Sequence, residues 1–244
     1  MKILLTNDDG IKAEGLKVLA DIMSNYGDVY VVAPDQDRSA VGHGMTLNRP
    51  LKIQEEQVAS ALLARSVNGT PADCIKYALT FLKLEPDLVL SGINCGANVG
   101  TDILYSGTVS GAIEANLYDY PALAVSTAAA NYDSVREYLP FIMSKISLKA
   151  LDNSRTLNIN FPAGQPKGIR VTNVGISTYE NVYKEEDGGY RLSGSLIDID
   201  QPEDTDVKTL LTGSISISPL KFNFNDEEKI RELKLIFSKE AKTR

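Results

Sequence analysis

Two adjacent carboxylates, Asp8 and Asp9, follow the apolar run at residues 3–5 after Thr6 and Asn7, and they precede Gly10. The apolar run predicts a short strand that is buried on both faces. In an open parallel α/β sheet, ligands bind outside the carboxyl ends of the strands, where this pair would lie. Adjacent carboxylates repel each other and are costly to dehydrate, so a hard divalent cation between them is one interpretation. The other is that either aspartate starts a turn or caps the next helix.

Two more polar loops are expected at the same edge of the sheet. Ser39 lies in a Gly-rich loop that follows a predicted strand at 28–34, and Asn94 and Asn98 lie in a loop that follows a predicted strand at 86–93. The second loop leads to Ser106, Gly107 and Thr108, which open a predicted helix. A helix N-terminus of this kind offers N–H groups, hydroxyls and a favourable dipole to an anion. An ordinary Ser/Thr helix cap explains the same residues without a ligand.

The elements that position these loops follow from hydrophobic patterning. An apolar run predicts a further buried strand at 121–126, and another strand is predicted at 156–161. Helical spacing predicts helices at 14–26, 71–82, 106–117 and 134–151. Thr70 is placed to cap the second helix, with Pro71 and Asp73 completing a sequence close to a capping box. This alternation predicts an α/β fold with a mostly parallel sheet.

The composition of the sequence changes after residue 175, where Tyr, Gly, Glu and Asp become frequent. Residues 1–175 are expected to form the catalytic core, and residues 176–244 to form an extension of the same domain. Within that extension we predict β-hairpins over 179–206, a late strand over 213–220 and a charged terminal helix over 227–244. Ile230, Leu233 and either Ile236 or Phe237 are expected to pack that helix inward.

Composition excludes several classes of function. The net charge of −7 argues against coating a nucleic-acid polymer. No segment approaches the ~20 apolar residues that span a bilayer, and the N-terminus lacks the pattern of a signal peptide. Cys74 and Cys95 show no spacing typical of a zinc or redox site. We therefore expect a cytoplasmic protein with reduced cysteines and no membrane partner.

Taken together, the motifs resemble the SurE family of metal-dependent nucleotidases. They stand in family order over nearly the whole chain, from the first residues to about residue 220. The matching motifs are Thr6-Asn-Asp-Asp-Gly10, Ala33-Pro-Asp35 with Ser39, Asn68-Gly-Thr-Pro-Ala-Asp73, Ser91-Gly-Ile-Asn94 with Gly96 and Asn98, Tyr105-Ser-Gly-Thr108, Leu157-Asn-Ile-Asn-Phe-Pro162 and Asp204-Thr-Asp206.

The resemblance implies a function and a set of site residues. It implies hydrolysis of nucleoside 5′-monophosphates, with 3′-monophosphates and polyphosphate as further substrates. One divalent cation per subunit, Mg²⁺ or Mn²⁺, would be bound by Asp8, Asp9, Ser39 and Asn94. Phosphate would be bound by Asn98, Ser106, Gly107 and Thr108. The resemblance also implies a Rossmann-like sheet flanked by helices, a projecting C-terminal β-hairpin arm exchanged between subunits, and a homodimer or homotetramer.

Three questions stay open at the level of sequence. Asp8 or Asp9 could act as general base, and the only histidine, His43, could be a general acid or a loop residue without a chemical role. A phosphatase that forms an aspartyl-phosphate is one rival function. The other is a non-enzymic nucleotide-binding module, although no dinucleotide-binding or Walker-type glycine motif is present.

Overall fold

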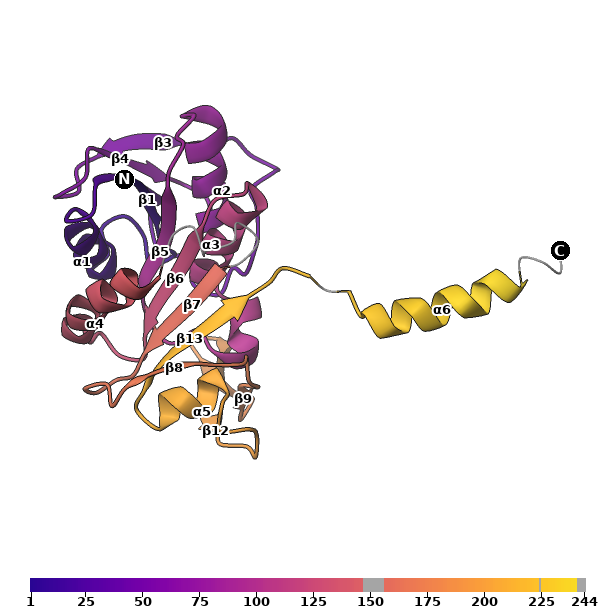
Figure 1. Cartoon of the computed structure of the whole chain (residues 1–244). Coiled ribbons are helices and arrows are strands. Elements are labelled where there is room, and N and C mark those ends of the chain that lie inside the picture. Colours follow the sequence, from indigo (N-terminus) through magenta and orange to yellow (C-terminus); the bar gives the residue numbers. More distant parts are fainter. Residues whose placement is uncertain (147–155, 224, 241–244) are drawn as a thin grey trace.

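A single mixed sheet organises the computed structural model, which describes residues 1–146, 156–223 and 225–240. Within these residues the sheet has nine strands in the order β3-β4-β2-β1-β5-β6-β7-β13-β8 (Figure 1). The strands are β1 Lys2–Thr6, β2 Asp28–Pro34, β3 Ile53–Glu56, β4 Leu63–Val67, β5 Leu88–Cys95, β6 Ala122–Thr127, β7 Thr156–Phe161, β8 Ile169–Val171 and β13 Ile215–Leu220. β4, β2, β1, β5, β6 and β7 run parallel, whereas β3 and β13 are antiparallel to their partners β4 and β7.

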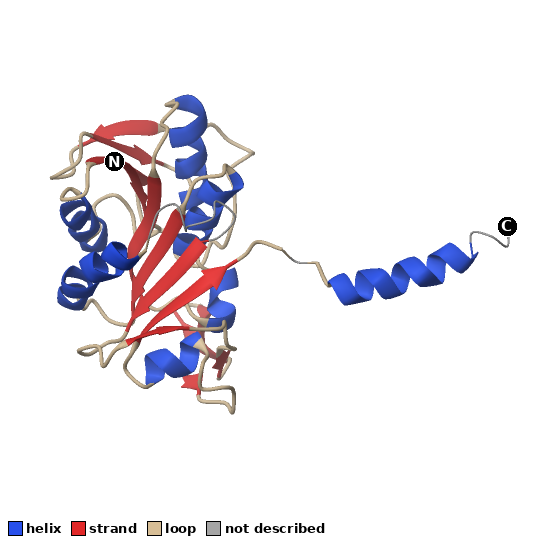
Figure 2. Ribbon diagram, viewed as in Figure 1, coloured by secondary structure: helices blue, strands red, loops and turns tan. Residues whose placement is uncertain are grey.

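Helices cover both faces of this sheet (Figure 2). The α-helices of the described residues are α1 Glu14–Met23, α2 Pro71–Lys76, α3 Gly107–Leu117, α4 Tyr132–Lys145, α5 Asp206–Leu211 and α6 Glu227–Glu240, and α6 is the one that projects away from the sheet. α1 and α4 pack on one face, and α2 and α3 pack on the other (Figure 1). The predicted α/β class with a mostly parallel, Rossmann-like sheet is therefore confirmed.

The central strand β1 is formed by the apolar run after Met1. Ile3, Leu4 and Leu5 are fully buried, and they alternate between the two hydrophobic cores on opposite faces of the sheet. A central strand of a parallel sheet is covered on both sides, so it requires an apolar side chain at each position. β1 ends at Thr6, so Asp8 and Asp9 lie just beyond the strand, at the carboxyl edge of the sheet.

Helix α2 begins at the predicted cap. The Thr70 hydroxyl accepts the Asp73 N–H, the Asp73 carboxylate accepts the Thr70 N–H, and Pro71 occupies the first turn. The predicted helix nevertheless changes form after Lys76, because Tyr77–Phe81 is a π-helical turn. The 134–151 helix is observed as Tyr132–Lys145, and the end of that prediction lies outside the described residues.

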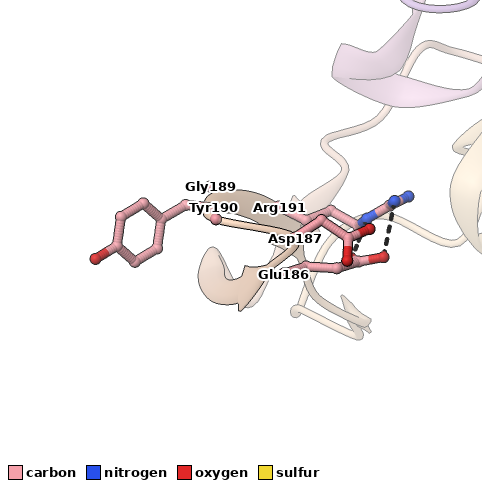
Figure 3. A pocket seen from close by; sticks show the side chains of 6 residues that line it. Glu186, Asp187, Gly189, Tyr190 and Arg191 are labelled. Carbon is pink, nitrogen blue, oxygen red and sulfur yellow. Dashed lines mark hydrogen bonds and ion pairs between the residues drawn. The ribbon is translucent and has the colours of Figure 1, made fainter.

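The predicted hairpins form an arm outside the main sheet. β9 Thr178–Tyr179 pairs with β12 Leu196–Ile197, and β10 Val182–Glu186 pairs with β11 Gly189–Ser193. Figure 3 shows the tip of the second pair, where Arg191 forms an ion pair with Glu186. An open hollow at this tip contains none of the predicted site residues. The late strand β13 returns from the arm to the main sheet, between β7 and β8.

The terminal helix does not pack inward as predicted. Leu233 is 43% exposed, Ile236 is 45% exposed and Phe237 is 64% exposed. After β13, α6 projects away from the sheet (Figure 1). Among the residues that the structure describes, none covers the apolar side of α6, so these three side chains stay exposed.

Candidate active site

Backbone contacts join the three predicted polar loops at the carboxyl edge of the sheet. The Arg38 N–H, next to Ser39, donates to the Asp8 carbonyl oxygen over 2.7 Å. The Cys95 N–H, next to Asn94, donates to Asp9 Oδ2 over 3.4 Å. The ends of β1 and β5 and the loop after β2 therefore meet, as the topological argument from sequence predicts.

Asp8 is the buried member of the acidic pair. It is 4% exposed, and burial is the main cause that raises its pKa from 3.8 to about 6. The hydrogen bond from the Thr108 hydroxyl opposes this rise, and the nearby charge of Asp9 adds to it. Burial also raises the pKa of Asp9, which is only partly buried. Burial therefore disfavours the charged form of both carboxylates.

Asp37 brings a third carboxylate to this edge. It contributes to the raised pKa of Asp9 and accepts the Ser39 N–H and hydroxyl, each over 2.6 Å. The sequence analysis did not single out this residue. Its position two residues before Ser39, in a loop expected at this edge, is the signal that could have identified it.

The donor chemistry of the site suits a hard cation. Among the described residues, no group of three or more His, Cys, Asp or Glu side chains forms a metal cluster. The predicted set is instead two carboxylates, the Ser39 hydroxyl and the Asn94 amide, all of which offer oxygen. The Asn94 amide nitrogen donates to the Gly96 carbonyl over 2.7 Å, so the amide oxygen is the atom left for a ligand. Oxygen-only sets favour Mg²⁺, Ca²⁺ or Mn²⁺ over softer metals. These residues fit such an ion.

The strand that carries Asn94, β5, is irregular just before that residue. The pairing of β5 with β6 shifts between Gly92 and Asn94, and the Gly92–Ile93 peptide bond is cis. Gly92 has φ +136°, and a Cβ there would lie 2.2 Å from the Val125 carbonyl oxygen. Only glycine fits this position, so the identity of residue 92 is fixed by the shape of the strand that carries Asn94.

The N-terminus of α3 contacts Asp8 directly. Ser106 caps the helix by accepting the Val109 N–H over 3.0 Å, and Thr108 donates its hydroxyl to Asp8. A Cβ at Gly107 would lie 2.8 Å from Asp8 Cβ, so a small residue is required. Both hydroxyls are engaged within the protein. The Val109 N–H is bound to the Ser106 hydroxyl and the Thr108 N–H contributes a hydrogen bond to Asp8, so the Gly107 N–H, which has no intrahelical partner, is the donor left for an anion at the start of the helix.

Asn98 is held from three sides inside the protein. Its N–H donates to Asn160 Oδ1 over 2.8 Å, and its carbonyl oxygen accepts the Asn158 amide over 2.7 Å and the Asn160 amide over 3.2 Å. Its own amide nitrogen donates to Ser126 Oγ over 2.9 Å. Asn158 and Asn160 are fully buried on one face of β7. The Asn-x-Asn motif of that strand thus fixes a predicted phosphate-binding loop, a role that sequence analysis did not identify.

Asp206 ties the same loop to the base of the hairpin arm. Its carboxylate accepts the Gly100 N–H over 3.0 Å and the Gly175 N–H over 2.8 Å. Burial raises the pKa of Asp206, although these backbone donors oppose the rise. The late Asp-Thr-Asp motif therefore connects the arm to the site.

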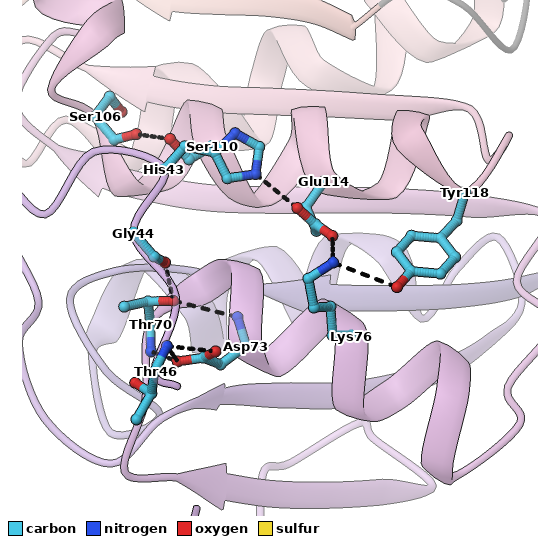
Figure 4. Close-up of polar contacts among 10 residues, drawn as sticks. All are labelled: His43, Gly44, Thr46, Thr70, Asp73, Lys76, Ser106, Ser110, Glu114 and Tyr118. Carbon is cyan, nitrogen blue, oxygen red and sulfur yellow. Dashed lines mark hydrogen bonds and ion pairs between the residues drawn. The ribbon is translucent and has the colours of Figure 1, made fainter. Parts of the chain in front are cut away.

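A cluster of charged groups lies along α3, behind its N-terminus (Figure 4). His43 Nε2 lies 2.7 Å from Glu114 Oε2, and Lys76 Nζ lies 2.5 Å from Glu114 Oε1. These residues come from a loop and from two different helices. Sequence analysis named only His43, because no local spacing links it to the other two.

Comparisons with known proteins agree over almost the whole chain. Residues 3–181 match the family model described as survival protein SurE. The chain is 43% identical to a protein of Alkaliphilus metalliredigens and 41% identical to one of Pelotomaculum thermopropionicum, both named 5′-nucleotidase SurE. Each comparison covers 96% of this chain, with 98% and 94% of the relative.

A solved structure supports the same assignment. The crystal structure of the SurE protein from Aquifex aeolicus superposes with a TM-score of 0.82 at 33% sequence identity, covering 97% of this chain and 99% of that one. Among the described residues, no helix has the length and apolar character needed to cross a membrane.

Proposed function

The chain belongs to the SurE family, and we propose that it is a 5′-nucleotidase that hydrolyses nucleoside monophosphates with one divalent cation per subunit. The observation that carries the metal dependence is the placement of Asp8, the neighbour of Asp9 in the chain, against the N-terminus of α3. An acidic pair alone repels phosphate. A cation bound between the carboxylates and the phosphate would offset this repulsion, so that an anion can bind at the N-terminus of the neighbouring helix.

Asp8, Asp9, Ser39 and Asn94 are the proposed cation ligands. The cation, when bound, supplies Lewis-acid polarisation of a phosphoryl oxygen and makes water more acidic. The Gly107 N–H at the start of α3, together with Asn98, Ser106 and Thr108, forms the proposed phosphate site. Their fixed dipoles favour the negative charge that develops on the transferring group.

The two carboxylates are suited to different tasks. Asp8 is buried and accepts the Thr108 hydroxyl, whereas Asp9 is partly exposed. We therefore assign to Asp9 the acceptance of a proton from the attacking water. The oxygen of water then bonds to phosphorus, and the bond from phosphorus to the sugar oxygen breaks with its electron pair left on that oxygen. The released sugar oxygen takes a proton from solvent and becomes a hydroxyl, and Asp9 returns its proton to solvent.

Phosphate release from a panel of nucleotides tests this proposal. The protein is treated with chelator and assayed on nucleoside 5′- and 3′-monophosphates and on polyphosphate, with Mg²⁺, Mn²⁺ or Ca²⁺ added back separately. We expect activity on 5′-monophosphates to disappear with chelation and return with Mg²⁺ or Mn²⁺. Activity on 3′-monophosphates and on polyphosphate is expected to be weaker. Activity that survives chelation in full would refute the metal requirement.

Matched variants test whether phosphate release depends on the acidic pair Asp8 and Asp9. Asp8→Asn and Asp9→Asn should each lower turnover on the order of 100-fold. Asp133→Asn, a change to an exposed carboxylate on α4, should leave turnover unchanged. Covalent labelling of Asp8 or Asp9 by substrate phosphate would favour the aspartyl-phosphate rival. Tight nucleotide binding with no phosphate release would favour the non-enzymic one.

We also propose that the hairpin arm mediates a homodimer or homotetramer. On the arm, Tyr183 is 67% exposed and Tyr190 is 76% exposed, so both rings are available for contact with a second subunit, where tyrosine is enriched. Light scattering after size-exclusion chromatography measures the mass in solution. A monomer at micromolar concentration would refute this assignment. The cytoplasm stays the predicted location.

A further inference from the structure

The chain that follows Ser39 is fastened to two helices. The Gly42 N–H donates to the Tyr105 carbonyl oxygen over 2.9 Å, just before the cap of α3. Thr70 Oγ1 donates to the Gly44 carbonyl oxygen over 2.7 Å, and the Thr46 N–H donates to Asp73 Oδ1 over 3.0 Å. Figure 4 shows these bonds to α2 below the contact between His43 and Glu114. Residues 42–46 thus form a strap, the name used below for this segment.

Glu114 is the buried anchor of the strap on α3. Its side chain is only 2% exposed, and it contacts both His43 and Lys76. Burial alone would raise the pKa of Glu114, but the hydrogen bonds from His43 and Lys76 hold it below its ordinary value. Glu114 is therefore a charged acceptor, and a buried carboxylate without such partners is strongly destabilising. Lys76 remains beside Glu114 if the histidine is removed, so loss of His43 does not leave the carboxylate without a cation.

Because Glu114 lies on α3, its contact with His43 connects the strap to the helix that carries the proposed phosphate site. Thr108 and Glu114 are six residues apart on one helix, which is about 9 Å at 1.5 Å per residue. One end of that rigid element carries the proposed phosphate site. The other carries the carboxylate that holds His43, four residues after the proposed metal ligand Ser39. The strap therefore links the metal loop to the phosphate helix.

We propose that His43 is a positioning residue: by its bond to Glu114 it fixes the Ser39 loop against α3 and thereby sets the metal ligand relative to the phosphate site. This inference rests on the proposed function for its effect on turnover, but its effect on cation binding is independent of turnover. It differs from the role of general acid, in which His43 would donate a proton to the leaving alkoxide. The bond to Glu114 already engages Nε2, the outer nitrogen of the ring.

Two variants of His43 and one control test the proposal. His43→Ala removes the bond to Glu114, whereas His43→Gln places an amide donor near the former Nε2 position and keeps that bond. Leu47→Ala changes an 80% exposed side chain just beyond the strap and serves as control. Affinity for Mn²⁺ is measured by calorimetry without substrate. Turnover is measured with a nucleoside monophosphate and with p-nitrophenyl phosphate, whose leaving group requires no protonation.

The expected result is a loss shared by both substrates. His43→Ala should weaken Mn²⁺ binding and lower kcat/KM about tenfold on each substrate, since small displacements of catalytic ligands have effects of this size. His43→Gln should restore most of both quantities, and Leu47→Ala should match the wild type. If the wild type binds Mn²⁺ but releases no phosphate, the proposed function is refuted. The effect of the His43 variants on Mn²⁺ affinity can still be measured in that case, so the two proposals are tested separately.

Three outcomes would overturn the proposal. Loss of turnover on the nucleotide with normal turnover on p-nitrophenyl phosphate would identify a general acid. Unchanged Mn²⁺ affinity and turnover in His43→Ala would show that the strap needs no such contact. A lower melting temperature with normal Mn²⁺ affinity would indicate that His43 only stabilises the fold.

Discussion

Asp8→Asn should make the metal-free protein more stable while it lowers turnover on the order of 100-fold. Asp8 is 4% exposed, and its pKa rises from 3.8 to about 6 on folding, mainly because of burial. At pH 7.5 the side chain is ionised in both states, and the folded state bears the cost. The change in pKa corresponds to about 3 kcal/mol of unfolding free energy. An asparagine removes that ionisation, and its side-chain oxygen can still accept the Thr108 hydroxyl.

The raised pKa of Asp8 also predicts how the stability difference between wild type and variant changes with pH. Between pH 3.8 and about 6 the folded protein retains a proton that the unfolded chain has released. The unfolding free energy of the wild type contributed by Asp8 therefore falls as the pH rises through this window. The variant has no such titration, so its advantage should grow from less than about 1 kcal/mol at pH 4 to about 3 kcal/mol above pH 7.

Urea unfolding in the presence of chelator measures this difference. Unfolding free energies of wild type and variant are compared at pH 4, 5, 6 and 7.5, with Asp133→Asn as control for loss of a surface charge. Added Mn²⁺ should then raise the midpoint of the wild type and not that of the variant. A variant that is equally or less stable than the wild type at pH 7.5, or an advantage independent of pH, would refute the electrostatic account of Asp8.

Three further substitutions test the packing of the site. Gly107→Ala places a Cβ 2.8 Å from that of Asp8 and should abolish Mn²⁺ binding measured by calorimetry; normal affinity would show that the helix end can move. Asn160→Ala removes two bonds to the Asn98 backbone and should raise KM about tenfold while the melting temperature falls; an unchanged KM would separate Asn98 from substrate binding. Thr70→Ala removes a helix cap and should lower the unfolding free energy by about 1 kcal/mol, detectable in urea; no loss would contradict the capping geometry.

The sheet could be predicted from sequence because its strands are encoded locally. β2 and β7 are observed at the predicted residues. β2 is nearly continuous in apolar residues, and in β7 apolar residues alternate with Asn158 and Asn160. The edge at which the polar loops meet also follows from parallel topology, which places all carboxyl ends together. The predicted neighbourhood of Asp8, Asp9, Ser39 and Asn94 is an instance of this rule.

The failures concern surfaces that no local pattern specifies. The apolar spacing of α6 correctly predicted a helix, but it contains no information about what covers the apolar side. In the structure, α6 projects away from the sheet (Figure 1). Pattern defines which side of a helix is apolar, and only tertiary or quaternary contacts decide its partner.

The sequence by itself determined the α/β class, the capped start of α2, and the residue types at the acidic edge. Those features depend on interactions within a few residues or on the periodicity of one element. The tertiary structure alone decided which distant groups meet: Asn98 with Asn158 and Asn160, and Glu114 with His43 and Lys76. Such pairs lie tens of residues apart in the chain, and a buried polar group selects its partner by geometry. The sequence therefore gives the chemistry available to the site, and the fold decides which groups hold it in place.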